Sequence, residues 1–413
     1  MQANTAAQRS LISVIAADGL SRFGSAMTAL AIPWFVLVTS NSVARTSVAV
    51  FAGAAGMVVA LLLGGAAVDR LSFARASIFA DLLAGSVIAF IPLLYLTVGL
   101  PFWLLLILVF AGALFDTPAG VARYSALPGL ARQAAVRFER ANAIEEAVIT
   151  ISALCGPALA GVLIAMVGAA NVLWIDAMTF ALSAGLMLSV ARRNGEPESR
   201  DATHTSYLGE ILDALRFVQR DAVLFPLILF FGVMNLAIGP IEALFVPVVA
   251  RDVYHSAYAL GLLSSALAIG ALGGNAIFGL IGERLPRHVV FSLGFLVVPL
   301  CFLILAFEPP FVVAIVTLGL VGLALSFTNF LEYIIYFERI PESMRAKGLG
   351  VTGAIGSASV PIGRLLAGAG LAAFGLAATL GGFALLFAPV PLFMLVAPVF
   401  RELRAPRLDL PRS

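Results

Sequence analysis

Long apolar runs recur along almost the whole chain, and each is long enough to cross a bilayer as a helix. About 20 consecutive apolar residues span the hydrocarbon core. The runs are continuous rather than alternating, which is typical of membrane helices and not of membrane β-barrels. The sequence therefore predicts an all-α membrane protein with twelve transmembrane helices, at about 11–37, 46–67, 77–98, 102–123, 143–166, 172–191, 223–248, 257–281, 289–307, 311–335, 348–373 and 377–399.

The composition is that of a protein that lies mostly in lipid. Of 413 residues, 61% are hydrophobic and 12% are charged, whereas soluble domains average about 45–50% and 25%.

The first run carries Asp18 and Arg22 and lacks a small-residue cleavage site, so we expect no cleavable signal peptide. Cys155 and Cys301 both lie inside apolar runs, which predicts neither a disulfide framework nor a metal site. We expect no cofactor.

Basic residues are distributed very unevenly between the two sets of connections. Of the 25 Lys and Arg residues, 21 fall on the side that holds the N-terminus. This count includes Arg123, the last residue of the fourth run, which is assigned to the connection that follows. Arg45 and Arg251 fall on the opposite side, while Arg22 and Arg364 lie within runs. Lys and Arg concentrate in cytoplasmic loops, so both termini are predicted to be cytoplasmic. No separate basic domain exists that would predict a nucleic-acid partner.

The longest polar stretch divides the chain into two sets of six runs. Within it, Leu208, Ile211, Leu212 and Leu215 recur at helical spacing, which predicts an amphipathic helix on the cytoplasmic surface. The predicted organisation is an N-terminal six-helix bundle, a cytoplasmic linker, a C-terminal six-helix bundle and a cytoplasmic tail, at residues 1–192, 193–221, 222–400 and 401–413.

A short turn sequence recurs in the two halves. The turn after the second run reads Gly-x-x-x-Asp-Arg from Gly65 to Arg70, and the turn after the eighth reads Gly-x-x-x-Glu-Arg from Gly279 to Arg284. The offset of 214 residues (279 − 65) is close to half the chain. Transporters built from parallel repeats bind substrate near the midplane between the repeats. The repetition predicts two pseudo-symmetric six-helix bundles.

Asp18 and Arg22 are the first charged residues that need an explanation at membrane depth. A charge near the bilayer centre costs roughly 2.5–3.5 kcal/mol even on the lenient insertion scale. The two residues are four apart, acid first, which places them on one helix face in the favourable order. We interpret them as a switchable acid–base site for protonation or substrate, and the alternative is a static ion pair within the first bundle.

Three further charged residues inside the runs are candidate site residues. Glu242 in the seventh run and Arg364 in the eleventh fall at similar depth in the outer half, so they are expected to pair, either lining a cavity, forming an outer gate or serving structure alone. Asp116 lies in the cytoplasmic third of the fourth run and is grouped with the cytoplasmic turn after the second run. Its expected partner is Arg70 or Arg22, and the alternative is a structural role near that turn.

Other acids have simpler expected roles. Glu145 and Glu146 follow Asn142, a pattern that predicts a helix start with acids on its positive end; the alternative is that one of the two acids meets the cavity. Asp176 near the outer interface is expected to be structural, and Asp81 near a cytoplasmic end is expected to pair with arginines of the loops. All three histidines fall in predicted loops, so proton coupling would have to use carboxylates.

The turn after the second run and two helix motifs resemble a known family. Gly65, Asp69, Arg70 and Arg75 match the cytoplasmic signature of the major facilitator superfamily, with Ser72 where a glycine is usual. The whole chain is similar to the superfamily's secretion-effector and efflux branch, which includes macrolide and siderophore exporters. The resemblance implies alternating access, a monomer in the bacterial cytoplasmic membrane, and a turn that locks the cytoplasmic side shut in the outward-facing state.

The fifth run carries a second element of this resemblance. Gly156, Pro157 and Gly161 are similar to the antiporter signature of the fifth helix, although Ala143, Ser152 and Ala160 stand where that signature has glycines. Glycine and proline here also predict a bend and close helix packing. A packing kink and an antiport motif are thus both open interpretations.

These observations favour a secondary transporter that exports an amphipathic or hydrophobic small molecule, such as a drug, siderophore or metabolite, in exchange for protons. The alternative is a proton-coupled importer or a lipid transporter of the same fold. An enzyme is not expected, because no His-Glu-x-x-His motif and no histidine cluster lies at membrane depth. A channel is not expected either, because no filter-like polar loop is present.

Overall fold

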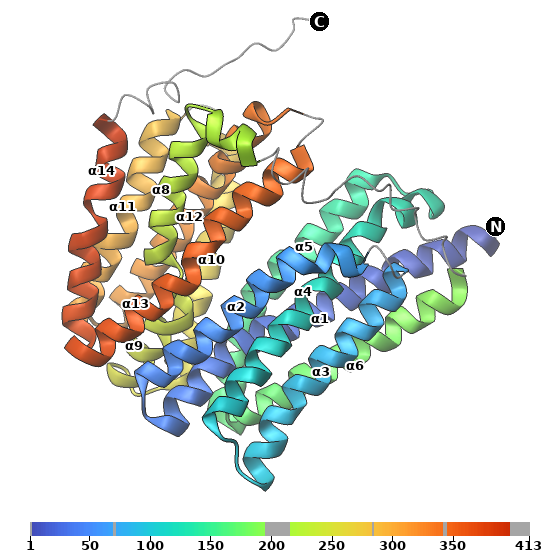
Figure 1. Cartoon of the computed structure of the whole chain (residues 1–413), viewed down its shortest axis with the longest axis horizontal. Coiled ribbons are helices and arrows are strands. Elements are labelled where there is room, and N and C mark those ends of the chain that lie inside the picture. The colour runs from blue at the N-terminus through green and yellow to red at the C-terminus, as the bar shows by residue number, and fades with distance from the viewer. Residues whose placement is uncertain (1, 69–71, 195–214, 283–284, 342–344, 397–413) are drawn as a thin grey trace, which may run out of the picture. The chain divides into compact units, whose positions relative to one another are not determined.

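The computed structural model describes residues 2–68, 72–194, 215–282, 285–341 and 345–396. Every regular element in these residues is helical, which confirms the all-α fold class. Residues 215–220 form a short helical piece ahead of α8. The labelled elements (Figure 1) are α1 Gln2–Ser40, α2 Val43–Val68, α3 Phe73–Thr97, α4 Phe102–Gln133, α5 Phe138–Val167, α6 Ala169–Asn194, α8 Leu224–Ile238, the π-helix η1 Ile241–Phe245, α9 Val246–Asp252, α10 Ala257–Ile281, α11 Arg287–Ala306, α12 Phe311–Arg339, α13 Arg345–Phe387 and α14 Pro389–Val396.

Eleven helical stretches in the described residues are long and apolar enough to cross a membrane. The last of them, Gly348–Leu395, has 48 residues, and at 1.5 Å per residue a straight helix of that length would be roughly 70 Å long, more than twice the hydrocarbon thickness. It is not straight, because Gly375 interrupts α13 with φ 78° and ψ −179°. Glycine is favoured there because a side chain makes positive φ costly.

The helices form two compact units. The first comprises Met1–Thr203 and Glu242–Leu262, and the second comprises His204–Ile241 and Leu263–Ser413. In the first unit α1 packs against α5 and α6, α3 packs against α4 and α6, and α2 packs against α4. Its core cluster lies among α1, α4 and α6 and includes Leu11, Val14, Leu127, Leu130 and Met187.

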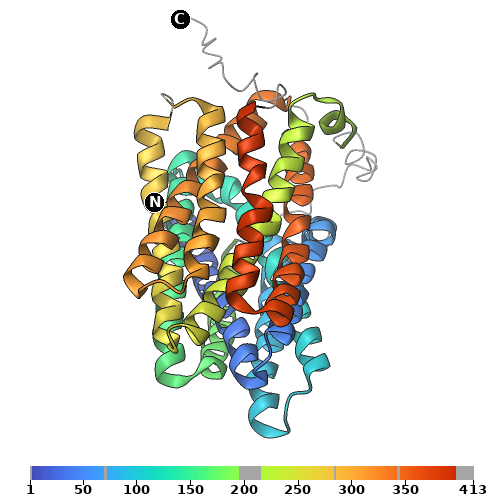
Figure 2. The same cartoon turned by 90° about the vertical axis from the view of Figure 1, so that its left-hand side faces the viewer.

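The second unit is held together by α8, α11, α12, α13 and α14. There α13 packs against α8, and α11 packs against α12, α13 and α14; in Figure 2, α14 is the red helix beside α11. Phe230 and Phe231 of α8 meet Phe291 and Phe295 of α11 edge-to-face, with ring centroids 5.2–5.6 Å apart between the helices. Such aromatic contacts fill a core and add to the stability of area burial alone.

Glycine permits the same kind of close helix contact in each unit. A Cβ on Gly56 would overlap the carbonyl of Phe110, where α2 crosses α4, and a Cβ on Gly270 would overlap the carbonyl of Gly319, where α10 crosses α12. Gly56 and Gly270 are 214 residues apart (270 − 56), the offset of the repeated turn. Small residues let membrane helices approach to backbone contact.

The cytoplasmic signature is only partly described. Gly65 lies in α2, and Asp69, Arg70, Glu283 and Arg284 lie outside the described residues, as do most of the predicted amphipathic helix and the tail 401–413. Ser72 is extended, with φ −60° and ψ 144°, and its side chain accepts a hydrogen bond from the backbone N–H of Arg75 as the N-cap of α3. The serine at the usual glycine position thus starts the third helix, a role serine favours.

Asp221 connects the start of α8 with the end of α12. Its Oδ1 accepts hydrogen bonds from the N–H groups of Val223 and Leu224, at 2.9 and 2.8 Å, and from Nη1 of Arg339 at 3.1 Å. Burial raises the pKa of Asp221, but the two N–H groups and the guanidinium outweigh it and hold the pKa below its ordinary value of 3.8.

We expect the Asp221→Asn variant to flatten the acid limb of the stability profile. A carboxyl whose pKa is lowered by folding stabilises the protein above its unfolded-state pKa, near 3.9, and this stabilisation is lost as pH falls through the folded-state value. Thermal unfolding at pH 7 and pH 3 should therefore show a smaller difference for Asp221→Asn than for the wild type. An equal difference in the two proteins would contradict the assignment.

Candidate functional site

Asp18 and Arg22 pair directly on α1, as their spacing predicts. Nε of Arg22 donates to Oδ2 of Asp18. The two side chains differ sharply in exposure, since 37% of Arg22 is accessible and only 1% of Asp18 is. The guanidinium of Arg22 is therefore the partly exposed member of a pair whose carboxylate is buried.

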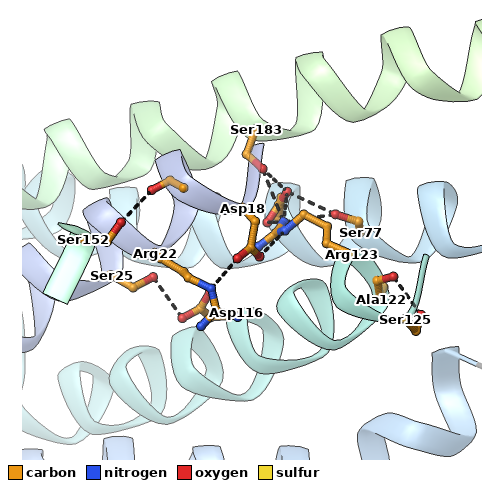
Figure 3. A network of polar contacts seen from close by, with 12 residues as sticks. Asp18, Arg22, Ser25, Ser77, Asp116, Ala122, Arg123, Ser125, Ser152 and Ser183 are labelled. Atoms are coloured by element: carbon orange, nitrogen blue, oxygen red, sulfur yellow. Dashed lines mark hydrogen bonds and ion pairs between the residues drawn. The ribbon is translucent and has the colours of Figure 1, made fainter. Parts of the chain in front are cut away.

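Arg123 of α4 is a second and more deeply buried partner of Asp18. Figure 3 shows its guanidinium beside Asp18, and its Nε lies 2.8 Å from Oδ1 of that residue. Its Nη1 lies 2.9 and 2.8 Å from the two carboxylate oxygens of Asp81 on α3. Only 2% of Arg123 is exposed. A buried charge of this kind is tolerated only when it is paired and fully hydrogen-bonded.

Two hydroxyl groups complete the surroundings of this ion pair. Nη1 of Arg123 donates to Oγ of Ser77 at 3.1 Å, and Oγ of Ser183 donates to Oδ2 of Asp81 at 2.7 Å. Ser77 lies on α3 and Ser183 on α6, so the network joins α1, α3, α4 and α6 (Figure 3).

The assignment of Arg123 to a cytoplasmic connection was wrong. The helix does not end there, because α4 continues to Gln133, ten residues beyond the predicted end of the fourth run. The prediction stopped at the first charge, whereas pairing with Asp18 and Asp81 lets the helix carry this charge inside the bundle. The basic residues remain strongly one-sided without it.

Glu145 of α5 adds a third carboxyl to Asp18 and its two arginines. Its carboxyl lies within hydrogen-bonding reach of the carboxyl of Asp18, and only 2% of the residue is exposed. Within the described residues, Oε2 of Glu145 has no hydrogen-bond partner. The expected role at a helix start was wrong: α5 begins at Phe138, two turns earlier, and so places Glu145 inside the bundle.

The cluster holds more acids than bases. Asp18, Asp81 and Glu145 share Arg22 and Arg123, and Asp116 lies near them on α4, where it accepts a hydrogen bond from Ser25 Oγ at 3.0 Å (Figure 3). Four ionised carboxyls would exceed the two guanidiniums by two negative charges. Two carboxyls in contact cannot both be ionised at low cost, so the Asp18–Glu145 pair is suited to hold a proton.

Asp176 forms a separate buried site between α6 and α1. It accepts hydrogen bonds from the hydroxyls of Thr28 and Thr179. A Cβ on Gly24 would overlap its carboxyl, so α1 needs glycine there. These contacts agree with the structural role expected of Asp176.

The glycines of the fifth-helix motif make two different close contacts. A Cβ on Gly156 would lie 2.6 Å from Cβ of Ala26, where α5 packs against α1. Gly161 meets Gly261 of α10 backbone to backbone, and a Cβ on Gly261 would lie 2.8 Å from Cα of Gly161. Pro157 lies between these contacts inside α5.

Residues 242–262 belong to the first unit although they follow α8 in the chain. Besides the glycine contact with α5, Nη1 of Arg251 donates to the carbonyl of Leu37 at 3.3 Å and lies 3.4 Å from Oδ1 of Asn41, at the end of α1. This segment is therefore attached to the ends of two helices of the first bundle.

The other two residues predicted to form a site lie in different units. Glu242 is in the π-helix η1 of the first unit. Arg364 is in α13 of the second unit, where its Nε donates to the carbonyl of Gly239 at 3.1 Å. Gly239 lies two residues before the π-helix, a type of helix that is frequent at functional sites. The pairing of Glu242 with Arg364 stays a prediction.

Comparisons with known proteins agree on one kind of molecule. The chain matches the family described as transmembrane secretion effector over residues 6–409. It is 31% identical over 391 residues to the multidrug efflux pump Tap of Mycolicibacterium fortuitum, covering 94% of each chain. It is 22% identical to macrolide efflux protein A of Streptococcus pyogenes, covering 85% of this chain and 86% of that protein. The crystal structure of the nucleoside transporter NupG shares the fold, with a TM-score of 0.73, 13% identity, and 95% and 99% of the chains covered.

Proposed function

This chain belongs to the transmembrane secretion effector family of the major facilitator superfamily, and from that premise we propose that it exports amphipathic or hydrophobic small molecules in exchange for protons. The single observation that carries the proton coupling is the buried cluster of Asp18, Glu145, Arg22 and Arg123. The names of the efflux relatives support the direction of transport and the class of substrate.

We further propose twelve transmembrane helices, both termini in the cytoplasm, and a monomer that works by alternating access. The break at Gly375 supports the count, because it divides the last 48 apolar residues into two lengths that each suffice to cross. In this topology the Gly161–Gly261 contact lies at the outer end of the bundle. We assign the closure of the outer side to this contact and to the hydrogen bond between Arg251 of α9 and the end of α1.

The cluster offers a physical route for coupling. Asp18 is shared between Arg22, which is partly accessible, and Arg123, which is not. When Glu145 holds the proton, Asp18 remains ionised and satisfies both guanidiniums. A substrate that attracts Arg22 would loosen its hold on Asp18, and the shared proton would then be bound or released with the change of state. If substrate binding depends on protonation, the proton gradient can drive transport of the substrate against its own gradient.

Gly65, Asp69, Arg70 and Arg75 keep their proposed role as the cytoplasmic lock. Asp116 was grouped with them, but its hydrogen bond with Ser25 and its place near Arg22 associate it with the proton cluster as well. Glu242 and Arg364 are retained as a proposed outer pair.

The proposal is tested in inverted vesicles whose interior is acidified. A proton antiporter in this orientation should accumulate an exported compound such as ethidium. We expect Asp18→Asn to abolish accumulation driven by the pH gradient while retaining exchange of labelled for unlabelled compound, because the amide removes one carboxyl of the pair that shares the proton. Arg22→Ala should reduce both activities.

Glu139→Gln is the matched control, since its carboxylate is 72% exposed on the same helix as Glu145. It should accumulate the compound as the wild type does. If Asp18→Asn and Arg22→Ala both transport normally and remain coupled to pH, the assignment of the site is wrong. If an outwardly directed gradient drives no accumulation by the wild type, proton-coupled export is wrong.

A further inference from the structure

A cavity of about 380 Å³ lies between α10 and α12 of the second unit. The two helices touch at Gly270 and Gly319 and again at Gly274 and Leu323. Farther along α10 the ring of Phe278 meets the rings of Phe327 and Phe330 of α12, with centroids 5.4 Å apart in both pairs. The cavity is lined on α12 by residues between Gly322 and Tyr333, towards the end of the helix that carries Arg339.

Polar side chains from both helices line this cavity. Asn275 of α10 and Asn329, Ser326 and Tyr333 of α12 all line it. Oγ of Ser326 donates to the carbonyl of Leu323 at 2.8 Å. The side chains of Asn275, Asn329 and Tyr333 make no hydrogen bond within the described residues; Asn275 is half-buried, whereas Asn329 and Tyr333 are exposed at the rim of the cavity. Two carboxamides and a phenol therefore present free donors and acceptors to the same cavity.

Two of these polar residues lie within candidate membrane spans, where a side chain without a hydrogen bond is costly. Asn275 lies in the span Ala257–Ile281 and Asn329 in the span Phe311–Arg339. A polar group without a partner is costly in hydrocarbon, so such residues in spans face protein, water or a bound molecule. Because these side chains make no hydrogen bond within the described residues, they are available to water or to a bound molecule.

The remaining walls are apolar and aromatic. Leu267, Ala271, Leu325 and Phe330 complete the lining. Phe330 is held by Phe278, whose ring is stacked on it at 5.4 Å with an interplanar angle of 6°. None of the described residues that line the cavity carries a charge. An apolar cavity of this size with a few convergent polar groups has the character of a small-molecule site.

We infer that the cavity between α10 and α12 is a binding subsite for the uncharged, hydrogen-bonding part of an amphipathic substrate, with Asn275, Asn329 and Tyr333 as the recognising groups. The inference rests on the proposed function for its role in export. The amides pair with carbonyl, amide or hydroxyl groups of the ligand, and Phe330 takes an aromatic ring. In the proposed topology the subsite lies on the cytoplasmic side, where an exporter takes up its cargo.

The test is binding of chloramphenicol, a neutral aromatic amide with two hydroxyls, to the purified full-length protein in lipid nanodiscs. Asn275→Leu and Asn329→Leu should each weaken binding about fivefold to tenfold, the effect of one lost hydrogen bond. Ile277→Leu, two residues from Asn275 and outside the lining, should bind as the wild type does. Tetraphenylphosphonium, a cation without hydrogen-bonding groups, should bind all four proteins alike.

A second measurement does not depend on the stability of the leucine variants. Asn329→Cys in a Cys155→Ser background carries one accessible thiol, because the other native cysteine, Cys301, is buried. Chloramphenicol should slow its alkylation by an uncharged maleimide. Unchanged affinity in both leucine variants, or alkylation unaffected by the compound because a lipid chain fills the cavity, would overturn the subsite. Neither result would affect proton-driven accumulation in vesicles, so the subsite and the export function fail separately.

Discussion

Replacing Arg123 by methionine is expected to destabilise the protein by about 3–5 kcal/mol, the usual cost of removing one partner from a buried ion pair. The substitution leaves Asp18 with Arg22 alone and leaves Asp81 with only the hydroxyls of Ser77 and Ser183. Methionine fills much of the same volume, so the loss would come from the unpaired carboxylates rather than from a cavity. The measurement is the unfolding temperature of the full-length protein in detergent, compared between Arg123→Met and the wild type.

Two further variants identify the cause of this loss. Arg137→Met removes the same side chain from a site where 85% of it is exposed, and it should change the unfolding temperature little. Adding Asp81→Asn to Arg123→Met removes the stranded charge and should recover part of the lost stability. The claim that Arg123 stabilises the protein by pairing with Asp18 and Asp81 would be contradicted by either of two results. One is that Arg123→Met lowers the unfolding temperature only slightly, and the other is that adding Asp81→Asn lowers it further.

Replacing either glycine of the Gly161–Gly261 contact by alanine is expected to force α5 and α10 apart. A Cβ on Gly261 would lie 2.8 Å from Cα of Gly161 and 3.3 Å from the carbonyl oxygen of Ala158. These neighbours are backbone atoms that cannot rotate away, and overpacking of this kind typically costs 1–3 kcal/mol. Because the contact is assigned to closure of the outer side, the variants should populate the state in which residues 242–262 are released.

Cysteine labelling measures this release. Leu260→Cys introduces a thiol at a position that is fully buried in the first unit, and its alkylation should become faster when Gly161→Ala is added. Gly185→Ala is the matched control, because a Cβ on this glycine of α6 meets nothing within 4 Å and alanine favours the helix. Equal labelling rates in Gly161→Ala and Gly185→Ala would contradict a gating role for the contact.

The helices and one ion pair could be predicted from the sequence because both are local properties. Apolar runs of bilayer length mark the spans, and the i, i+4 spacing of Asp18 and Arg22 brings them together on any regular helix. The boundary between the last two runs followed the hydropathy pattern near residue 375, where the backbone breaks at Gly375.

The rest of the site depends on contacts between helices, which spacing does not reveal. Arg123 pairs with Asp18 across 105 residues, and Gly161 meets Gly261 across 100. A signal for Arg123 was nevertheless present, since the next charged residue is Arg132 and the residues between are largely apolar. A longer fourth span would have placed Arg123 at depth and required a carboxylate partner for it.

Glu145 was misplaced for a related reason. Asn142 is a good N-cap in isolation, but in the structure it accepts a hydrogen bond from the hydroxyl of Tyr124 inside a helix that has already begun. Local propensity was overridden by tertiary packing, and the acid that followed went into the bundle. A charged residue at the end of an apolar run can therefore lie inside the bundle when another helix supplies a partner, as Arg123 and Glu145 do.

The most direct test of the central claim counts protons on the purified protein. In a weakly buffered solution with a pH indicator, the wild type should release or take up protons when it binds a compound that it accumulates in vesicles. Asp18→Asn and Glu145→Gln should bind the compound with no such proton exchange, because each removes one carboxyl of the pair that shares the proton. Proton exchange equal to that of the wild type in both variants would contradict the account.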